Sequence, residues 1–151
     1  MSYSKPSPLK TELCHSDSEE ETLRIAKNVG RSLTPPRVIL LYGELGSGKT
    51  LFTRGIATSV GVVDSSVVRS PSFTLVNQYT SPTGPIYHID LYRLEGFRDL
   101  YSIGIEEILS SSAIVIIEWA EKLLIEPKNP IQIRILVDPT TDRRQFEIKN
   151  L

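Results

Sequence analysis

The chain has 151 residues, of which 40% are hydrophobic and 23% are charged, which suits one globular domain and leaves too little chain for two ordinary ones. The formal net charge of −1 argues against a surface that binds polyanions broadly. Cys14 is the single cysteine, which excludes an intramolecular disulfide and indicates a reducing compartment.

The N-terminal residues predict an extension followed by an edge strand. Residues 1–10 are polar, include two prolines and contain no apolar core of a signal peptide. We expect them to be a flexible extension, with a single domain over residues 11–151. Residues 11–16 predict a short edge strand. The longest apolar runs, such as residues 113–117, are too short to span a membrane, so we expect a cytoplasmic protein with no membrane partner.

Residues 16–33 predict the first helix. Ser18 and Glu21 predict a capping box, and acidic residues suit the positive end of the helix dipole. The Thr-Pro-Pro segment at residues 34–36 ends the helical pattern. The continuous apolar run at residues 37–42 then predicts a strand buried on both faces.

The rest of the chain predicts further strands and short helices. A glycine-rich loop precedes an expected helix at residues 50–61, and residues 72–79 and 85–92 predict an antiparallel hairpin. The remaining expected elements are one or two short helices in 94–111 broken near Gly104, a buried strand at 113–119, a short helix or loop at 120–127, and paired strands at 131–138 and 145–150.

Residues 43–50 fit the phosphate-loop pattern G-x-x-x-x-G-K-S/T, between an apolar strand and an amphipathic helix. Its glycines allow backbone N–H groups to approach phosphate oxygens, and the following helix contributes its dipole. Lys49 would face the β- and γ-phosphates, and Thr50 would offer its hydroxyl to Mg²⁺. The nucleotide-binding residues expected here are Gly43, Glu44, Leu45, Gly46, Ser47, Gly48, Lys49, Thr50 and Leu51.

A second protein ligand for Mg²⁺ is expected at the end of a neighbouring buried strand. Glu118 and Asp90 each follow an apolar run, where an unpaired acid would be costly to desolvate. We favour Glu118 for the metal shell, and Asp90 as a second ligand or a group that orients water. Either acid would otherwise be a solvated residue at a strand end.

Weaker features surround these acids. Ser70, Ser72 and Thr74 lie where a mobile loop would sense the γ-phosphate, although an ordinary turn fits equally well. Arg93 would stabilise phosphate charge or pair with a surface acid. For the lone His88, ordinary packing is the simpler expectation. Trp119, the sole tryptophan, would pack in the core or stack near the nucleotide.

The pattern leaves three functions open. No guanine-specificity motif of the form N/T-K-x-D is present, so ATP and ADP are the expected ligands. An ATPase is one reading, and a small-molecule or nucleotide kinase is another, although a kinase usually needs an arginine-rich lid and the only arginine pair is Arg143-Arg144. The third is a nucleotide-binding scaffold without hydrolysis.

Several segments together resemble the bacterial TsaE (YjeE) family of tRNA threonylcarbamoyladenosine biosynthesis proteins. The combination of S-P-x-F-x-L, D-L-Y-R-L and I-E-W is more specific than the phosphate loop alone. The matching segments are GELGSGKTLFTRG (43–55), VRSPSFTLVNQY (68–79), YHIDLYRL (87–94), IGIEE (103–107) and IIEWAEK (116–122).

The resemblance implies a Mg²⁺-dependent P-loop ATPase that assists a TsaB–TsaD complex and does not itself transfer the threonylcarbamoyl group. Contact with tRNA would be only indirect, through the complex, and we expect a monomer in isolation. By position, the resemblance implies that Lys49 and Thr50 hold phosphate and Mg²⁺, that Glu118 is the acid on the metal side, and that Asp90 is needed for hydrolysis, which makes Lys49, Asp90 and Glu118 the expected catalytic residues. The resemblance also places Trp119 close to the nucleotide and Ser18 near the adenine.

These expectations combine into one fold, a three-layer α/β domain of the P-loop NTPase type with a mixed parallel and antiparallel sheet. The phosphate-loop strand and the Glu118 strand should be parallel and near the centre of the sheet. The nucleotide should then bind at the C-terminal edge of these strands.

Overall fold

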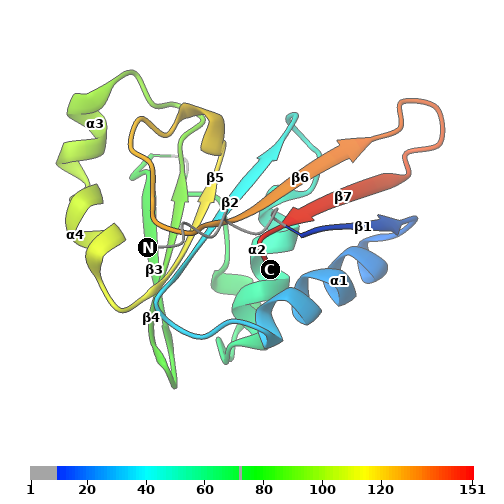
Figure 1. The fold of residues 1–151 in the computed structure, drawn as a ribbon, viewed down its shortest axis with the longest axis horizontal. Helices are drawn as coiled ribbons and strands as arrows, with labels where there is room; N and C mark the ends of the chain where they lie inside the picture. The colour runs from blue at the N-terminus through cyan, green and yellow to red at the C-terminus, as the bar shows by residue number, and fades with distance from the viewer. Residues whose placement is uncertain (1–9, 72) are drawn as a thin grey trace, which may run out of the picture.

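The structure is a computed structural model and describes residues 10–71 and 73–151. Within these residues, seven strands form one mixed sheet in the order β1-β7-β6-β2-β5-β4-β3 (Figure 1). The strands are β1 Thr11–Ser16, β2 Arg37–Gly43, β3 Val76–Ser81, β4 Gly84–Asp90, β5 Ile114–Glu118, β6 Ile131–Val137 and β7 Arg144–Lys149. The helices are α1 Glu19–Arg31, α2 Lys49–Ser59, α3 Phe97–Ser102 and α4 Ile105–Ser110, with short 3-10 helices η1 Ser65–Val67 and η2 Ala120–Lys122.

The two most apolar strands, β2 and β5, lie at the centre of the sheet. They pair in parallel, with Leu41 opposite Glu118. β6 is parallel to the other side of β2, and β4 is parallel to the other side of β5. The expected central parallel pair is therefore confirmed, and the carboxyl ends of β2, β4 and β5 meet at one edge.

Helices cover both faces of this sheet (Figure 1). On β2, Ile39 and Leu41 belong to the core that includes buried residues of α1 and α2. Val38 and Leu40 point to the opposite face and pack in the core that includes α3 and α4. This alternation produces three layers and confirms the predicted fold class.

The predicted strand at 72–79 is wrong at its beginning. β3 starts only at Val76, because the preceding residues form a turn. The Leu75 N–H donates to the Pro71 carbonyl at 3.1 Å, and Leu75 has a positive φ of 64°, which is incompatible with a strand. Ser72 lies outside the described residues.

The hairpin itself is confirmed, with a tighter turn than expected. Ser81 pairs with Gly84, so only two residues separate the strands, where the sequence suggested a loop at 80–84. β4 ends at Asp90, the acid predicted at the strand end, although the β-rich residues continue to 92, because the Tyr92 N–H donates to the Asp90 Oδ1 atom at 2.9 Å and turns the chain.

The cap of α1 differs from the predicted capping box in one of its two hydrogen bonds. Ser18 is the N-cap and accepts from the Glu21 N–H at 3.1 Å, as expected. The Glu21 carboxylate, however, accepts from the Asp17 N–H at 2.7 Å and not from Ser18. The helix covers residues 19–31, because residue 16 still belongs to β1, which is the predicted edge strand paired with β7.

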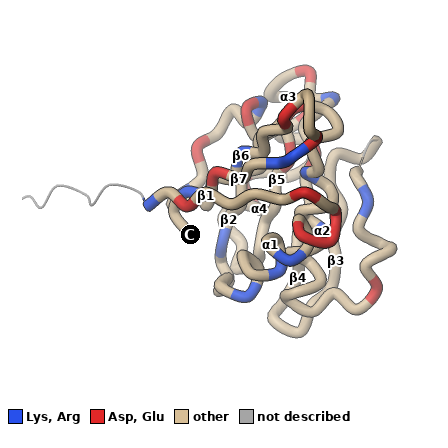
Figure 2. Tube along the Cα trace, turned by 90° about the vertical axis from the view of Figure 1, so that its right-hand side faces the viewer, with Lys and Arg blue, Asp and Glu red and all other residues tan. Residues whose placement is uncertain are grey.

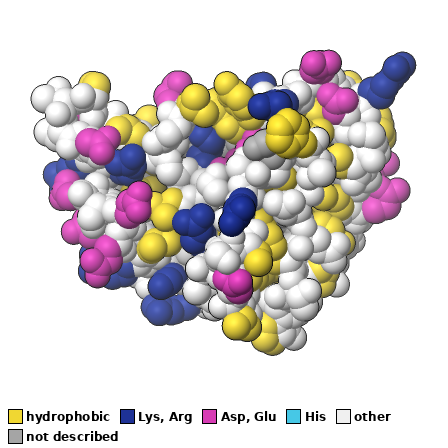
Figure 3. Space-filling model, turned by 180° about the vertical axis from the view of Figure 1, so that it is seen from behind, with side chains coloured by type: hydrophobic (Ala, Val, Ile, Leu, Met, Phe, Trp, Pro, Cys, Tyr) yellow, Lys and Arg dark blue, Asp and Glu magenta, His cyan; other side chains and the backbone are white. Residues whose placement is uncertain are grey.

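The predicted extension at 1–10 lies, except for Lys10, outside the described residues, so the proposed domain boundary stays a prediction. In the part of the chain that is described, no helix has the length and apolarity needed to cross a membrane. Basic and acidic positions are distributed along the fold (Figure 2), and both signs lie interspersed with apolar side chains on the face seen from behind (Figure 3).

Close packing of α1 on α2 predicts that Gly55→Ala destabilises the protein. A methyl group at Gly55 would lie 2.5 Å from the Ala26 Cβ atom and 3.2 Å from the Leu23 carbonyl oxygen. Alanine gains about 1 kcal/mol of helix propensity over glycine, but overpacking costs about 1–3 kcal/mol. We expect a net loss of stability in urea unfolding. Gly96→Ala, which adds a methyl group in open space, is the control, and equal stability of both variants would contradict this packing.

Candidate functional site

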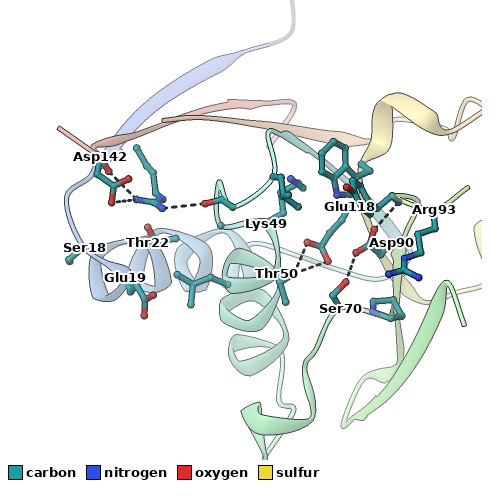
Figure 4. A pocket seen from close by; sticks show the side chains of 18 of the residues that line it. Ser18, Glu19, Thr22, Lys49, Thr50, Ser70, Asp90, Arg93, Glu118 and Asp142 are labelled. Atoms are coloured by element: carbon teal, nitrogen blue, oxygen red, sulfur yellow. Dashed lines mark hydrogen bonds and ion pairs between the residues drawn. The ribbon is translucent and has the colours of Figure 1, made fainter. Parts of the chain in front are cut away.

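A cavity of about 570 Å³ opens at the edge where β2, β4 and β5 end (Figure 4). Its walls come from the loop after β2, the first turn of α2, the ends of β4 and β5, the turn before α1, and the turn between β6 and β7. The cavity lies where parallel sheets of this type bind ligands. The lining residues that matter most below are Lys49, Thr50, Asp90, Glu118, Trp119 and Arg144.

The loop after β2 delivers the N-terminus of α2 to this cavity. Gly46 and Gly48 have φ values of 76° and 108°, a backbone region that suits glycine. Gly48 is the N-cap of α2 and provides no side-chain acceptor for the first N–H groups of the helix. An uncapped helix N-terminus facing a cavity is suited to an anion such as phosphate.

The Lys49 side chain is buried against this loop. Its Nζ atom donates to the carbonyl oxygens of Gly43 at 2.6 Å and Glu44 at 2.9 Å. Burial lowers the pKa of Lys49, and the negative charges of Glu118, Glu121, Asp90 and Glu44, in decreasing order of effect, oppose that shift. The ammonium group is thus held in place but has lost water. The oxygens of a bound phosphate would provide acceptors and negative charge in place of that water.

Trp119 forms the wall over this ammonium group. The Lys49 Nζ atom lies 4.1 Å from the centroid of the Trp119 ring, a cation–π distance. The backbone of Trp119 has a positive φ of 57°, which costs on the order of 1 kcal/mol for a bulky residue. This strained conformation sits directly after Glu118, at the point where the chain turns from β5 into η2.

Glu118 meets Thr50 at the base of the cavity. Glu118 is only 2% exposed, and its Oε1 and Oε2 atoms accept from the Thr50 hydroxyl at 2.8 and 3.2 Å. Both residues were expected near a metal, and the fold brings them together across 68 positions of sequence. A buried carboxylate needs such donors to offset its desolvation.

Asp90 lies beside Glu118, because β4 and β5 pair in parallel with these two residues opposite one another. Asp90 is 8% exposed, and its Oδ2 atom accepts a hydrogen bond from the Ser70 hydroxyl. The second carboxylate oxygen accepts from the Tyr92 N–H. Both predicted acids therefore face one cavity, and Ser70 reaches the acid from the preceding loop.

The donor set fits Mg²⁺ that is bound together with phosphate. Among residues 10–71 and 73–151, no group of three or more His, Cys, Asp or Glu side chains forms a metal cage. Two carboxylates and one hydroxyl are too few ligands for a site made of protein alone, but Mg²⁺ commonly combines one or two carboxylates with phosphate oxygens and water. Thr50, Glu118 and Asp90 are the residues that could hold it.

The other predicted residues divide into two groups. Leu45, Gly46, Gly48 and Leu51 line the cavity, as does Ser18, which Figure 4 places at the end away from Asp90. Gly43, Glu44 and Ser47 do not line it, and the first two contribute carbonyl oxygens to Lys49 instead. Ser47 is buried beneath the loop.

The predicted γ-phosphate sensors are not equivalent. Ser70 lines the cavity, whereas Thr74 is exposed and donates to the Val76 carbonyl at 3.1 Å. Ser72 is not among the described residues. Arg93 lines the cavity, and its guanidinium group lies 5.1 Å from the centroid of the exposed Phe73 ring.

The contacts of two residues at the site were not predicted from the sequence. The Arg144 Nε atom donates to the Ser47 carbonyl at 3.0 Å, which ties the C-terminal strand β7 to the phosphate loop. His88 contacts Glu118 and Tyr79 and is fully buried. Only for His88 did the sequence contain a usable signal: His88 is two residues before Asp90 on one strand, so the two side chains lie on the same face of the sheet.

The sequence and the structure of the chain are similar to those of known proteins. A family model described as "Threonylcarbamoyl adenosine biosynthesis protein TsaE" matches residues 16–146. The chain is 39% identical to a tRNA threonylcarbamoyladenosine biosynthesis protein TsaE from Rickettsia bellii over 89% of this chain and 92% of that protein. The corresponding Nostoc sp. protein is 39% identical, with 86% and 80% covered. The crystal structure of Bacillus subtilis YdiB superposes with a TM-score of 0.72 at 28% identity, covering 96% of this chain and 88% of that one.

The contact of Lys49 with the indole predicts a pH-dependent signal from Trp119. Because the pKa of Lys49 is lowered, its ammonium group should lose its proton below pH 10.5, the ordinary value, as the pH rises. Removing the cation from the ring should change Trp119 fluorescence in a transition whose midpoint is below that value. Lys49→Arg stays charged and controls for tyrosine ionisation. The same transition in Lys49→Arg would contradict the assignment.

Proposed function

The chain belongs to the TsaE family of tRNA threonylcarbamoyladenosine biosynthesis proteins, and we propose that it binds and hydrolyses Mg-ATP in this cavity as a partner of a TsaB–TsaD-like complex. The observation that carries the proposal is the meeting of Lys49, Thr50, Asp90 and Glu118, from three separate elements, around one cavity. In this proposal the complex, not this chain, transfers the threonylcarbamoyl group and contacts tRNA.

Each of these residues has a role that its geometry supports. Lys49 would exchange the carbonyl oxygens of the loop for the β- and γ-phosphates, with the N–H groups of the first turn of α2 as further donors. Thr50 and Glu118 would hold Mg²⁺, which when bound neutralises charge on the same phosphates. Asp90, with Ser70 hydrogen-bonded to it, would orient the attacking water.

The remaining cavity residues suit the rest of the nucleotide. Trp119 covers Lys49 and would lie close to the phosphates or ribose. Ser18 and its neighbours, at the end of the cavity away from Asp90, would lie near the adenine. ADP would occupy the same positions after hydrolysis.

A kinase gains less support from this site. Kinases close an arginine-rich lid over the transferred phosphate. In the described part of the chain the arginines lining the cavity are Arg93 and Arg144, and Arg144 is hydrogen-bonded to loop carbonyl oxygens. These arginines therefore support an ATPase more than a kinase.

Substitution of the two acids should separate binding from hydrolysis. Glu118→Ala should reduce the Mg²⁺-dependence of ATP affinity, because it removes a metal ligand. Asp90→Ala should spare affinity and lower ATP turnover by about 100-fold, in line with loss of a general base or water-orienting group. Calorimetry and phosphate release measure the two effects. Glu126→Ala, an exposed acid outside the cavity, is the control, and the reverse pattern would exchange the two roles.

Turnover should be slow in isolation and should rise when a TsaB–TsaD-like pair is added, because a partner can order the catalytic site. By thermodynamic reciprocity, affinity for the partner should then depend on whether ATP, ADP or no nucleotide is bound. Phosphate release and complex formation measured in these three states test the prediction. Fast turnover alone, with phosphate passed to a small acceptor and no response to the partner, would favour the kinase.

A further inference from the structure

A buried histidine lies directly behind the proposed metal ligand. His88 is fully buried, does not line the cavity, and places its Nε2 atom 2.5 Å from the Glu118 Oε2 atom. On its other side, the His88 Nδ1 atom lies 2.9 Å from the hydroxyl of Tyr79, which is 6% exposed. The two rings lie 6.0 Å apart between centroids. This pair touches no part of the expected nucleotide position, so direct nucleotide binding does not explain it.

The carboxylate sets the direction of the hydrogen bond between His88 and Glu118. A carboxylate only accepts, so the His88 Nε2 atom carries the proton that points to Glu118. With Nε2 as the donor, the Nδ1 atom of the same tautomer accepts, and the Tyr79 hydroxyl at 2.9 Å can donate to it. Burial raises the pKa of Tyr79, so the hydroxyl keeps its proton. A Tyr79 hydroxyl that donates to Nδ1 supports the tautomer in which Nε2 donates to Glu118.

The two oxygens of the Glu118 carboxylate have different main partners. Oε2 accepts from His88, while Oε1 makes the shorter contact with the Thr50 hydroxyl. A carboxylate held from behind in this way cannot rotate freely, and it presents a defined oxygen to the side of the cavity where Thr50 lies. Hydrogen-bonding partners of this kind orient metal ligands in other proteins and typically change metal affinity about 10–100-fold.

The same strands connect this support to the loop that reaches the other acid. The Arg69 carbonyl oxygen accepts from the Asn77 side chain at 2.9 Å and lies 3.4 Å from the Tyr79 hydroxyl. The next residue, Ser70, is hydrogen-bonded to Asp90. β3 therefore contributes Asn77, which holds the carbonyl before the loop, and Tyr79, which contacts the histidine behind Glu118.

We propose that His88, oriented by Tyr79, is a positioning residue that fixes the Glu118 carboxylate for Mg²⁺ delivered with the nucleotide. The inference rests on the proposed binding of Mg-ATP and adds to it two residues that never touch the ligand. A purely structural role for His88 would make a different prediction, namely a loss of stability with no selective effect on Mg²⁺.

The test is the affinity of the full chain for ADP, measured by calorimetry with Mg²⁺ and with a chelator. In His88→Leu the Mg²⁺-dependent gain in affinity should fall about 10–100-fold relative to wild type, while the affinity for metal-free ADP should change by less than about twofold. His88→Gln, whose amide N–H₂ can donate to Glu118, should recover most of the Mg²⁺ effect. Tyr79→Phe removes only the hydroxyl and should give a smaller loss with the fold kept.

Matched controls come from the same chain. Tyr87 is next to His88 in sequence, but the Tyr87 side chain packs on the opposite face of the sheet, so Tyr87→Phe is one control. His15→Gln, which changes an exposed histidine on β1, is the other. Both should behave as wild type. If His88→Leu and Tyr79→Phe keep the full Mg²⁺ effect, or lose affinity equally with and without Mg²⁺, the positioning role is wrong. A wild-type chain that binds no ADP under either condition would instead overturn the proposed function together with this inference.

Discussion

The parallel pairing of β4 with β5 and of β5 with β2 is the constraint on which the site depends. It places Asp90 opposite Glu118, and Glu118 opposite Leu41, two residues before the phosphate loop begins. Strands that end in register deliver their terminal side chains to one edge, and here two acids arrive where α2 begins. A shift of either strand by one residue would turn its acid to the opposite face of the sheet, because side chains alternate.

The polar groups at this edge are buried, or partly buried in the case of Thr50, and their hydrogen bonds offset the loss of water. Lys49 is bound by loop carbonyl oxygens, Thr50 by Glu118, and Glu118 by His88. Leaving any of them unpaired would cost about 1–3 kcal/mol, more for a charged group. A nucleotide with Mg²⁺ would replace contacts that already exist. The residues of the site are therefore already ordered, and nucleotide binding would lose little conformational entropy.

Local sequence predicted the elements that carry the site, but not the contacts that cross the fold. The phosphate loop, the buried strands ending in Asp90 and Glu118, and the three-layer class follow from glycine spacing and apolar runs. The start of β3 at Val76 was predicted too early, because the β-rich composition of residues 72–79 continues through the turn that was one of two alternatives before this strand. The contact of Arg144 with the phosphate loop could not be predicted, because the two segments are 97 residues apart and pairing between distant segments leaves little trace in local pattern.

We propose that Lys49 and the acids beside it form a site for Mg-ATP. The decisive experiment is calorimetric titration of ATP, with and without Mg²⁺, into the wild-type chain and into folded Lys49→Ala. We expect the wild type to bind ATP more tightly with Mg²⁺, and Lys49→Ala to lose about tenfold or more in affinity, because it lacks the charge that faces the phosphates. Equal affinity of both proteins for ATP, or no binding by the wild type, would contradict it.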